Sequence, residues 1–384
     1  MIKWQSINDI STNVFAGGTP STSHAEYYDG DIPWIRSGEI DFNVIKSAER
    51  NISELGYNNS SAKKIRKNSV VMAMTGATVA KTAVVEIEAT ANQSVCAIET
   101  NEEIVNYKYL YYFLANNYFK IKSSAQGALT SLNLAMIKDI KIPIPSIKEQ
   151  RNYVGILDTF TASIDNLKQQ IELRKKQYEY YREKLLDLEG KDGVMMTTLG
   201  NIGCFIRGAG IQKSDFVEDG FGCIHYGQVH TKYDLSATKT ISKIGEPLYR
   251  KSKKAVKGDV VLATTSEDAA GVAKPVVWLG DEDIAISGDA YIFHHKQNGK
   301  YLAHVFSSHR FFLFKIKNAT GTKVVRISGD SMARFEFPLP SLEEQNRIVD
   351  KLDNFEAVIS NLEAQLAYRQ KQYEYYRNKL LTFE

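Results

Sequence analysis

The chain has 384 residues, of which 43% are hydrophobic and 24% are charged, and it contains only 8 prolines. This length allows two or three domains with cores of their own, and the ordinary composition excludes long disordered tracts. No apolar run reaches the roughly 18 residues of a membrane span, and "MIKWQSINDIS" lacks the basic and apolar regions of a signal peptide. We therefore expect a cytoplasmic protein that contacts no membrane.

The first segment, residues 1–146, is predicted to form a mixed α/β domain. The stretch "KNSVVMAMTGATVAKTAVV" from Lys67 has a β-branched strand, a Thr-rich turn and a second strand. The stretch "PWIRSGEI" precedes it, and an amphipathic helix is predicted over residues 108–122. Four basic residues gather just before the first strand: Lys63, Lys64, Arg66 and Lys67.

A long helix is predicted next, over residues 147–190. It follows "PIPS", where Ser146 is expected to cap the first turn with Glu149 as the partner in a capping box. Long side chains recur three and four positions apart, which indicates a coiled-coil seam. The seam comprises Leu157, Phe160, Ile164, Leu167, Ile171, Arg174, Tyr178, Tyr181, Leu185 and Leu188. About 40 helical residues would extend on the order of 60 Å.

The second segment, residues 191–341, resembles the first one weakly. Its "KGDVVLATTSEDAAGVAKPVV" and "CIHYGQV" correspond to the two stretches above, and a helix is predicted over residues 300–317. It carries 20 Lys and Arg against 15 Asp and Glu, a net charge of +5, whereas residues 1–146 carry 14 of each. A second basic cluster again precedes the strand: Arg250, Lys251, Lys253, Lys254 and Lys257.

A second long helix is predicted over residues 342–384, and it nearly repeats the first one. The seven residues "KQYEYYR" occur at 176–182 and again, 195 positions later, at 371–377. Ser341 and Glu344 take the capping positions. The second seam comprises Leu352, Phe355, Ile359, Leu362, Leu366, Arg369, Tyr373, Tyr376, Leu380 and Phe383. A repeat of this kind indicates one structural unit used twice.

These segments predict an α+β fold. Two globular mixed α/β domains, 1–146 and 191–341, are separated by two long helices packed as an antiparallel coiled coil, with an internal pseudo-twofold repeat. Tyr180 and Tyr375 lie off the seam, so that they, with Arg182 and Arg377, are candidates for contact with a partner. The alternative is that the repeated tyrosines only hold the helices together.

The two basic clusters suggest a nucleic-acid partner. Lys and Arg at matching places can neutralise phosphates, and neighbouring polar side chains can reach base edges. The alternative for each cluster is an ordinary solvated charge run.

Sequence signatures of catalysis are missing. No proline follows another proline, which excludes the Asn-Pro-Pro-aromatic site that holds a flipped base, and no GxxxxGK[ST] phosphate loop occurs. The seven histidines and the three scattered cysteines do not have zinc-site spacing. We expect no metal, no cofactor and no enzymatic activity in this chain.

Two divergent domains alternating with two near-identical helices, introduced by "IPIPSIKEQ" and "FPLPSLEEQ" and ending near "YYREKLL" and "YYRNKLL", resemble the specificity subunit of type I restriction-modification systems. The resemblance covers the whole chain. It implies two target recognition domains that each read one half of a bipartite sequence in double-stranded DNA, with the coiled coil setting the gap.

The same resemblance implies the partners. Two modification subunits would supply S-adenosylmethionine and the adenine-methylating site, and restriction subunits would add ATP- and Mg²⁺-dependent translocation and cleavage. Base-contacting residues do not carry over from the family, because these domains diverge. The polar loop residues that we expect to read bases are Arg36, Thr75, Thr78, Lys81 and Gln93 in the first domain, and His225, Gln228, Thr265, Ser266 and Lys274 in the second. The two basic clusters are expected to contact phosphates.

Two other readings remain open at this stage. One is a coiled-coil scaffold that binds proteins and has no DNA role. The other is an enzyme with an unfamiliar site.

Overall fold

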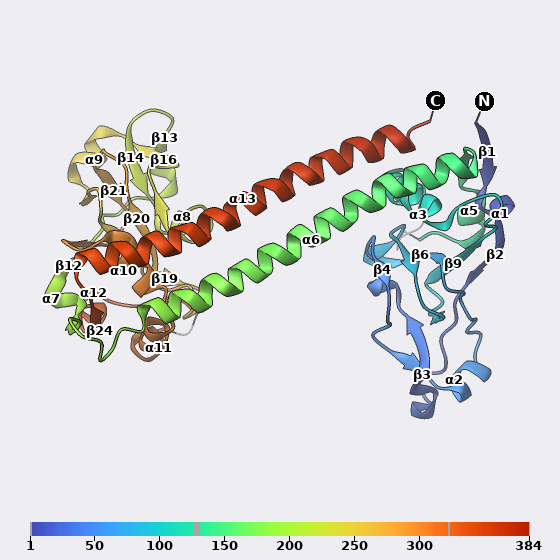
Figure 1. Cartoon of the computed structure of the whole chain (residues 1–384), viewed down its shortest axis with the longest axis horizontal. Helices are drawn as coiled ribbons and strands as arrows, with labels where there is room; N and C mark the ends of the chain where they lie inside the picture. Colours follow the sequence, from blue (N-terminus) through green and yellow to red (C-terminus); the bar gives the residue numbers. More distant parts are fainter. Residues whose placement is uncertain (1, 126–130, 322, 384) are drawn as a thin grey trace. The chain divides into compact units, whose positions relative to one another are not determined.

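The computed structural model describes residues 2–125, 131–321 and 323–383 (Figure 1). It divides into two compact units: unit 1 comprises Met1–Lys168 and Ala364–Glu384, and unit 2 comprises Gln169–Glu363. Each unit contains one globular head and a part of each long helix. We call the globular part within residues 2–146 head 1, and residues 191–341 head 2.

Two 40-residue helices, α6 (Ile147–Leu186) and α13 (Leu342–Leu381), confirm the two predicted long helices. Ser146 Oγ accepts from the Glu149 backbone at 3.3 Å and donates to its carboxylate at 2.7 Å, which completes the predicted capping box. Only half of the box forms at α13, because the Glu344 carboxylate pairs with Arg347 at 2.9 Å. The last predicted seam residue of the first helix, Leu188, lies beyond α6 and is buried in the core of head 2.

The long helices pack antiparallel along the predicted seam. In unit 2, the ring of Tyr181 stacks on Phe355 with centroids 5.2 Å apart, and Lys175, earlier on α6, pairs with Glu363, later on α13, at 2.7 Å. In unit 1, Phe160 stacks on Tyr376 at 5.4 Å. The contacts confirm the predicted antiparallel coiled coil.

Head 1 is built on three sheets. Their strand orders are β2 (Ser11–Ala16), β9 (Val95–Thr100), β6 (Ser69–Ala73), β7 (Thr82–Val85) and β4 (Val44–Ile45); β5 (Asn51–Ile52), β3 (Tyr28–Ile35) and β8 (Thr90–Ala91); and β1 (Lys3–Ser6) with β10 (Lys141–Ile144). Its helices are α1 (Ile7–Ile10), α2 (Glu54–Asn58), α3 (Tyr107–Asn116), α4 (Tyr118–Ser123), α5 (Leu134–Asp139) and the 3₁₀ turns η1 (Ala25–Tyr27), η2 (Ser37–Glu39) and η3 (Gly76–Thr78).

Head 2 has sheets that correspond to these, with further short strands. Their orders are β12 (Gly203–Arg207), β22 (Ala290–His295), β18 (Val260–Ala263), β20 (Lys274–Trp278) and β15 (Ser236–Ala237); β13 (Phe216–Val217), β16 (Ser242–Ile244), β14 (Phe221–Ile224), β21 (Ile284–Ile286) and β17 (Lys254–Ala255); β11 (Met195–Thr198) with β24 (Glu336–Leu339); and β19 (Thr265–Ser266) with β23 (Val325–Arg326). Its helices are α7 (Leu199–Ile202), α8 (Tyr226–Thr231), α9 (Glu246–Lys251), α10 (Gly299–Phe306), α11 (His309–Asn318), α12 (Gly329–Ala333) and the turn η4 (Lys213–Asp215).

The two heads share one topology, as the weak sequence match predicted. The strand pair β6–β7 corresponds to β18–β20, and the parallel pair β3–β8 corresponds to β14–β21. Even the backbone between the paired strands agrees, because Ala80 and Ala273 have positive φ values of 66° and 59° at the same place. Residues can therefore be compared position by position between the heads.

The sheets that contain β6 and β18 each separate two apolar layers. In β6, Val70 and Met72 face the cluster that contains α3 and the ends of the long helices, and Val71 and Ala73 face a second cluster. This alternation is the period of two that a strand buried on both faces requires. One face of each sheet thus fixes the head to the helices of its own unit.

A buried glutamine fixes each head to a long helix. Gln150 is fully buried and accepts from the backbone of Asn106 at 2.8 Å, and Gln345 accepts from Asn298 at 3.0 Å in the same way. A lysine from each head also pairs with the helix, Lys108 with Asp158 at 2.7 Å and Lys300 with Asp353 at 2.8 Å. The repeated "EQ" after the Pro-x-Pro-Ser element is therefore structural.

The single amphipathic helix predicted in each head is wrong in detail. Residues 108–122 fall on two helices, α3 and α4, and residues 300–317 fall on α10 and α11. Side chains at the breaks explain this. Asn117 donates back to the Phe113 carbonyl at 2.9 Å, and the Ser308 hydroxyl caps α11 by accepting from the Phe311 backbone at 3.2 Å. The apolar pattern of the sequence continues across both breaks, because the helices on either side of each break bury one face.

Candidate nucleic-acid interface

The five candidate base-reading residues of head 1 converge on one end of its strands. Backbone hydrogen bonds hold their loops together: Asn92 donates to the Ile35 carbonyl at 2.9 Å, and Met74 donates to the Ser94 carbonyl at 2.8 Å. These bonds place Gln93, Arg36 and Thr75 on neighbouring loops. Sequence reasoning predicts no contact between these loops, and the order of the strands in the sheets explains why they meet.

Arg36 lies directly after β3 and is held by two carboxylates. Glu39 accepts from the Arg36 backbone at 2.8 Å and from the Glu49 backbone at 2.9 Å, and its side chain is nearly buried. The Glu49 side chain is 64% exposed and pairs with the Arg36 guanidinium. Arg36 therefore remains at the surface, but its charge is already compensated.

The Thr75–Lys81 loop packs on the segment that follows Arg36. Thr78 donates to the Ser37 carbonyl at 2.9 Å, and the Lys81 ammonium pairs with Asp41, whose side chain is 65% exposed. On the neighbouring loop, Thr19 donates to the Gln93 side chain. Sequence reasoning missed Glu39, Asp41 and Glu49, although the Arg-x-x-Glu spacing of Arg36 and Glu39 was a usable capping signal.

The candidates of head 2 occupy the equivalent end of its strands. His225 follows β14 as Arg36 follows β3, since Ile224 pairs with Ile286 and Ile35 pairs with Ala91 in the same register. Thr265 and Lys274 correspond to Thr75 and Lys81. The prediction therefore selected matching positions in two domains of low similarity.

The same positions are much more enclosed in head 2. His225 is 7% exposed, and its Nδ1 accepts from the Gly227 backbone at 3.2 Å at the start of α8. Burial lowers the pKa of His225, with Lys213 contributing. Gln228 accepts from the His225 backbone at 3.2 Å and donates to Ser242 at 2.6 Å. Both side chains thus hold the local fold.

Lys274 caps the end of α8. Its ammonium donates to the carbonyls of His230 and Tyr233, both at 3.2 Å, and burial lowers its pKa. Thr265 is buried, and its carbonyl contacts the His230 ring at 2.9 Å. Ser266 is partly exposed, and the 266–271 turn after it carries the exposed Glu267 and Asp268.

The basic clusters correspond in structure as well as in sequence. Ile65 bridges to Ala89 just as Ala255 pairs with Ile284. Lys64 lies over the ring of Tyr57 at 5.5 Å, and Lys254 over that of Tyr249 at 4.8 Å. Salt bridges join Arg66 to Glu99, Arg250 to Glu246, and Lys257 to Asp281. Lys63, Lys67, Lys251 and Lys253 are exposed.

The clusters and the reading loops lie at opposite ends of one strand in each head. Lys67 precedes β6 and Thr75 follows it, and Lys257 precedes β18 and Thr265 follows it. Five strand residues span about 17 Å. A duplex that contacts both regions of a head must therefore extend along the strand direction.

Of the four partner candidates, Tyr180 and Tyr375 are exposed and Arg182 and Arg377 are partly buried. Tyr180 is 61% exposed and Tyr375 is 60% exposed, and each has a lysine one turn later over its ring, Lys184 at 5.9 Å and Lys379 at 5.8 Å. Arg182 and Arg377 stack over the seam residues Tyr178 and Tyr373 of their own helices.

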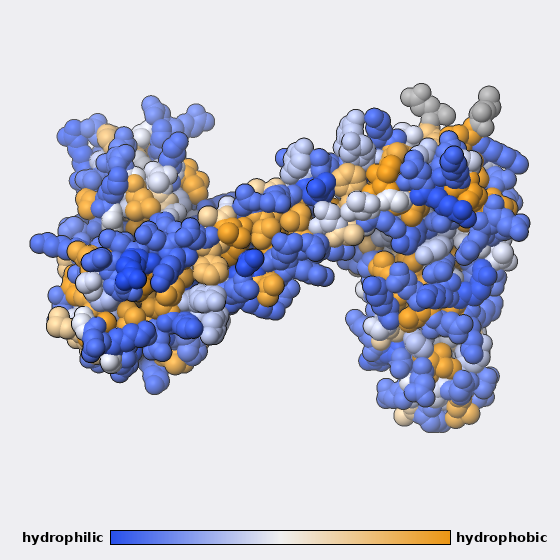
Figure 2. All heavy atoms as spheres, viewed as in Figure 1, coloured by the Kyte–Doolittle hydropathy of each residue, from blue (hydrophilic) through white to orange (hydrophobic). Residues whose placement is uncertain are grey.

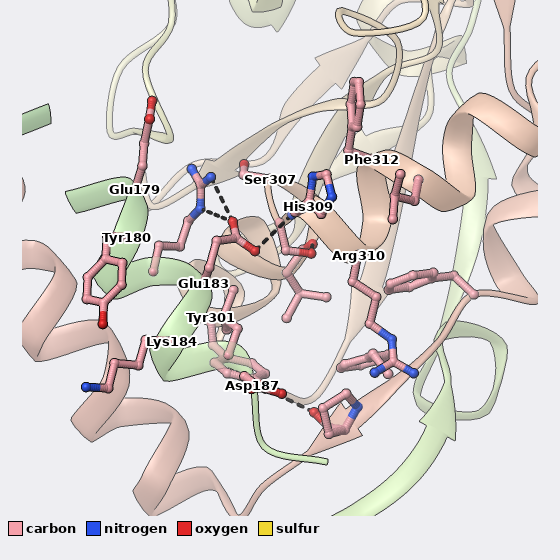
Figure 3. Close-up of a pocket in the computed structure, with 18 of the residues that line it drawn as sticks. Glu179, Tyr180, Glu183, Lys184, Asp187, Tyr301, Ser307, His309, Arg310 and Phe312 are labelled. Atoms are coloured by element: carbon pink, nitrogen blue, oxygen red, sulfur yellow. Dashed lines mark hydrogen bonds and ion pairs between the residues drawn. The ribbon is translucent and has the colours of Figure 1, made fainter. Parts of the chain in front are cut away.

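Tyr180 borders a groove of about 1260 Å³ in unit 2 (Figure 3). The last turns of α6 form one side, and His309, Arg310 and Phe312 of α11 form the other. Glu183 bridges the two, because its carboxylate binds Arg182 at 2.9 Å and the His309 backbone at 3.0 Å. Figure 2 shows hydrophobic side chains gathered around α11 and β24 on the same face.

Unit 1 carries larger side chains at two positions that correspond to this region of unit 2. Phe113 on α3 corresponds to Val305 on α10, and Trp4 on β1 packs edge-on against Phe113 with centroids 6.3 Å apart. Met196 takes the place of Trp4 in unit 2, because Met196 pairs with Pro338 in the same way as Trp4 pairs with Pro143. Unit 1 thus has two large rings where unit 2 has a valine and a methionine.

The family model for the type I restriction modification DNA specificity domain matches residues 1–174 and residues 191–368. The chain belongs to this family. The resemblance noted in the sequence is thereby confirmed, and the reading as a protein-binding scaffold has no support in these matches.

Two curated relatives cover most of the chain. A putative type I restriction enzyme specificity subunit of Haemophilus influenzae is 28% identical over 316 residues, 76% of this chain and 76% of that protein. The specificity subunit of the Escherichia coli type I restriction enzyme EcoR124I/EcoR124II is 29% identical over 316 residues, 77% of this chain and 75% of that protein.

Two solved structures share the fold. The S subunit of a type I restriction-modification system from M. genitalium is 14% identical, with a TM-score of 0.60 over 100% of this chain and 97% of that one. A chain from a structural study of assembly and conformational transition in a type I system is 18% identical, with a TM-score of 0.64 over 99% of this chain and 97% of that one. Within the described residues, no helix is long and apolar enough to cross a membrane.

Proposed function

We propose that this chain provides the DNA specificity of a type I restriction-modification complex. Each head reads one half of a bipartite, gapped sequence, and the paired helices α6 and α13 set the number of base pairs between the halves. The observation that carries this proposal is the duplication: two heads of one topology are each joined to a near-identical helix, and the family model matches both halves.

The surface that reads each half-site is formed by the loops after β3, β6 and β8 in head 1 and after β14, β18 and β21 in head 2. Arg36, with its fork of donors, suits a guanine edge in the major groove, and Gln93 suits an adenine edge. In head 2, the exposed turn of residues 266–271 makes most of the base contacts, because His225, Gln228 and Lys274 are engaged in the fold. Lys63, Lys67, Lys251 and Lys253 contact phosphates and set the position of each head.

Two modification subunits dock on the repeated helices, one at Tyr180 and one at Tyr375. Exposed tyrosines are suited to partner contact, because tyrosine is enriched at the centres of protein interfaces and among their hot spots. S-adenosylmethionine is bound, and adenine methylated, on these partners, and restriction subunits bring ATP- and Mg²⁺-dependent cleavage. The assembled complex acts on the chromosome in the cytoplasm.

The proposal is tested by mapping methylated adenines. This chain is co-expressed with its modification subunit in a host free of other adenine methylation, and the modification subunit alone is the control. A single two-part sequence with a fixed gap, methylated only when this chain is present, supports the proposal. Identical methylation with and without the chain contradicts it.

A further inference from the structure

Head 1 carries its two candidate base-reading cations in a compensated state. Arg36 is paired with Glu49 and lies 3.8 Å from Glu39, and Lys81 is paired with Asp41. The set of Arg36, Lys81, Glu39, Asp41 and Glu49 carries two positive and three negative charges. Within this set, no positive charge is left uncompensated to attract a phosphate.

The three carboxylates differ in how firmly they are held. Glu39 is 9% exposed, and its two oxygens bind the backbones of Arg36 and Glu49. Asp41 and Glu49 are 65% and 64% exposed, and exposed pairs are weak enough to exchange. Glu39 is thus a positioning residue that keeps Glu49 beside Arg36, while Asp41 and Glu49 are free to leave.

The equivalent positions in head 2 are built differently. Lys274 donates to two backbone carbonyls, and the ring of His225 is buried against its own loop. An exchange of Lys274 to a ligand would break the hydrogen bonds that hold the end of α8. The exposed ion pairs are therefore a property of head 1 and not of the shared topology.

We propose that Asp41 and Glu49 are specificity-determining residues, which mask Arg36 and Lys81 until the correct half-site is present. This inference rests on the proposed function and assigns it a mechanism in head 1. A base edge offers Arg36 two acceptors in fixed positions, and this bidentate contact compensates for the lost carboxylate pair. A duplex of the wrong sequence offers these cations only the negative charge of its phosphates, and the carboxylates already supply that charge.

The test compares the double variant Asp41→Asn/Glu49→Gln with wild type in the complete complex with modification subunits. Both changes keep the shape of the side chain and remove its charge. The control is Glu102→Gln/Glu103→Gln, two exposed carboxylates after β9 at the opposite end of the head, which gives the same change in net charge. Binding to cognate duplex, and to a duplex altered only in the half-site of head 1, is measured over a salt series.

The double variant is expected to bind the altered duplex roughly three- to tenfold more tightly, with a smaller gain on cognate DNA. Its salt dependence on the altered duplex should steepen by up to about two units, because two cations now reach phosphates. Adding Arg36→Gln and Lys81→Gln should abolish the gain, which shows that it acts through these cations.

Two results overturn the inference alone. One is an equal gain in the control variant, which assigns the effect to net charge. The other is an unchanged ratio of affinities for cognate and altered duplex while the wild-type complex still methylates one gapped sequence. A wild-type complex without sequence-specific methylation instead overturns the proposed function, and the inference falls with it.

Discussion

Head 1 and head 2 show how one topology can carry different surfaces. At the ends of equivalent strands, Lys81 forms an exposed ion pair with Asp41, whereas Lys274 caps α8 from the inside. Arg36 stays at the surface where His225 is buried. The difference teaches that an equivalent position is no guarantee of an equivalent role: the length of the helix after β3 or β14 decides which side chains remain free.

The largest expected difference concerns the two equivalent lysines. Lys274→Ala removes two hydrogen bonds from a charged donor to helix-end carbonyls and should lower the free energy of unfolding of unit 2 by about 2–3 kcal/mol. Lys81→Ala removes an exposed pair and should cost about 1 kcal/mol or less. Chemical denaturation of both variants measures the difference, and equal losses would show that the two lysines play the same part.

The next difference concerns the two docking positions. Tyr180→Ala, beside the open groove, should weaken binding of one modification subunit by about 2 kcal/mol, the usual size of a hot-spot tyrosine. Tyr375→Ala should cost less, because the larger rings of Phe113 and Trp4 replace a valine and a methionine at the corresponding positions of unit 1. Titration of the modification subunit, followed by calorimetry, resolves the two sites. Unchanged assembly in both variants would show that the tyrosines only hold the helices.

The buried polar contacts of the two units predict a difference in pH dependence. His304 in unit 2 stands where unit 1 has Tyr112, and burial lowers the pKa of His304 to about 3. The unfolded chain therefore binds a proton near pH 6.5 that the folded chain excludes, so His304 makes unit 2 less stable as pH falls below 6.5. His304 alone should cost about 1 kcal/mol between pH 6.5 and pH 5.5.

Hydrogen exchange of α10 and α3 at both pH values measures this effect. The matched variant is His304→Tyr, which copies the residue of unit 1. In this variant, α10 should no longer show the loss of stability at low pH that is caused by protonation of His304. An identical response in wild type and variant would exclude His304 as the cause.

The smallest expected effect distinguishes the basic clusters from the reading loops. Lys253→Ala/Lys254→Ala should weaken DNA binding to all sequences alike and flatten the salt dependence by about one to two units. Lys63→Ala/Lys64→Ala should do the same from head 1. A preserved slope in either variant would remove that cluster from the DNA surface.

Much of the fold could be predicted from the sequence, because the seam and the duplication are periodic. The heptads predicted both long helices, and the β-branched runs around Val70 and Val260 predicted the paired strands. The breaks at Asn117 and Ser308 could not be seen, since the apolar pattern runs through them. Capping by a single side chain has no periodicity.

The candidate site was predictable in place but not in character. Polar loop residues such as Thr75 and Thr265 do meet Arg36 or His225 at equivalent strand ends. The pair of Lys81 with Asp41 joins residues 40 positions apart, and Thr78 donates to the carbonyl of Ser37, 41 positions away. Such contacts follow from strand order, which local composition does not encode.

The most direct measurement of the central claim is a methylation map of the complex with Arg36→Gln in head 1. If the heads read separate half-sites, sequence preference should relax in one half, at a position that loses about 1–3 kcal/mol of discrimination, while the gap and the other half stay unchanged. A change in both halves, or in the gap, would contradict two independent reading heads on a common helical frame.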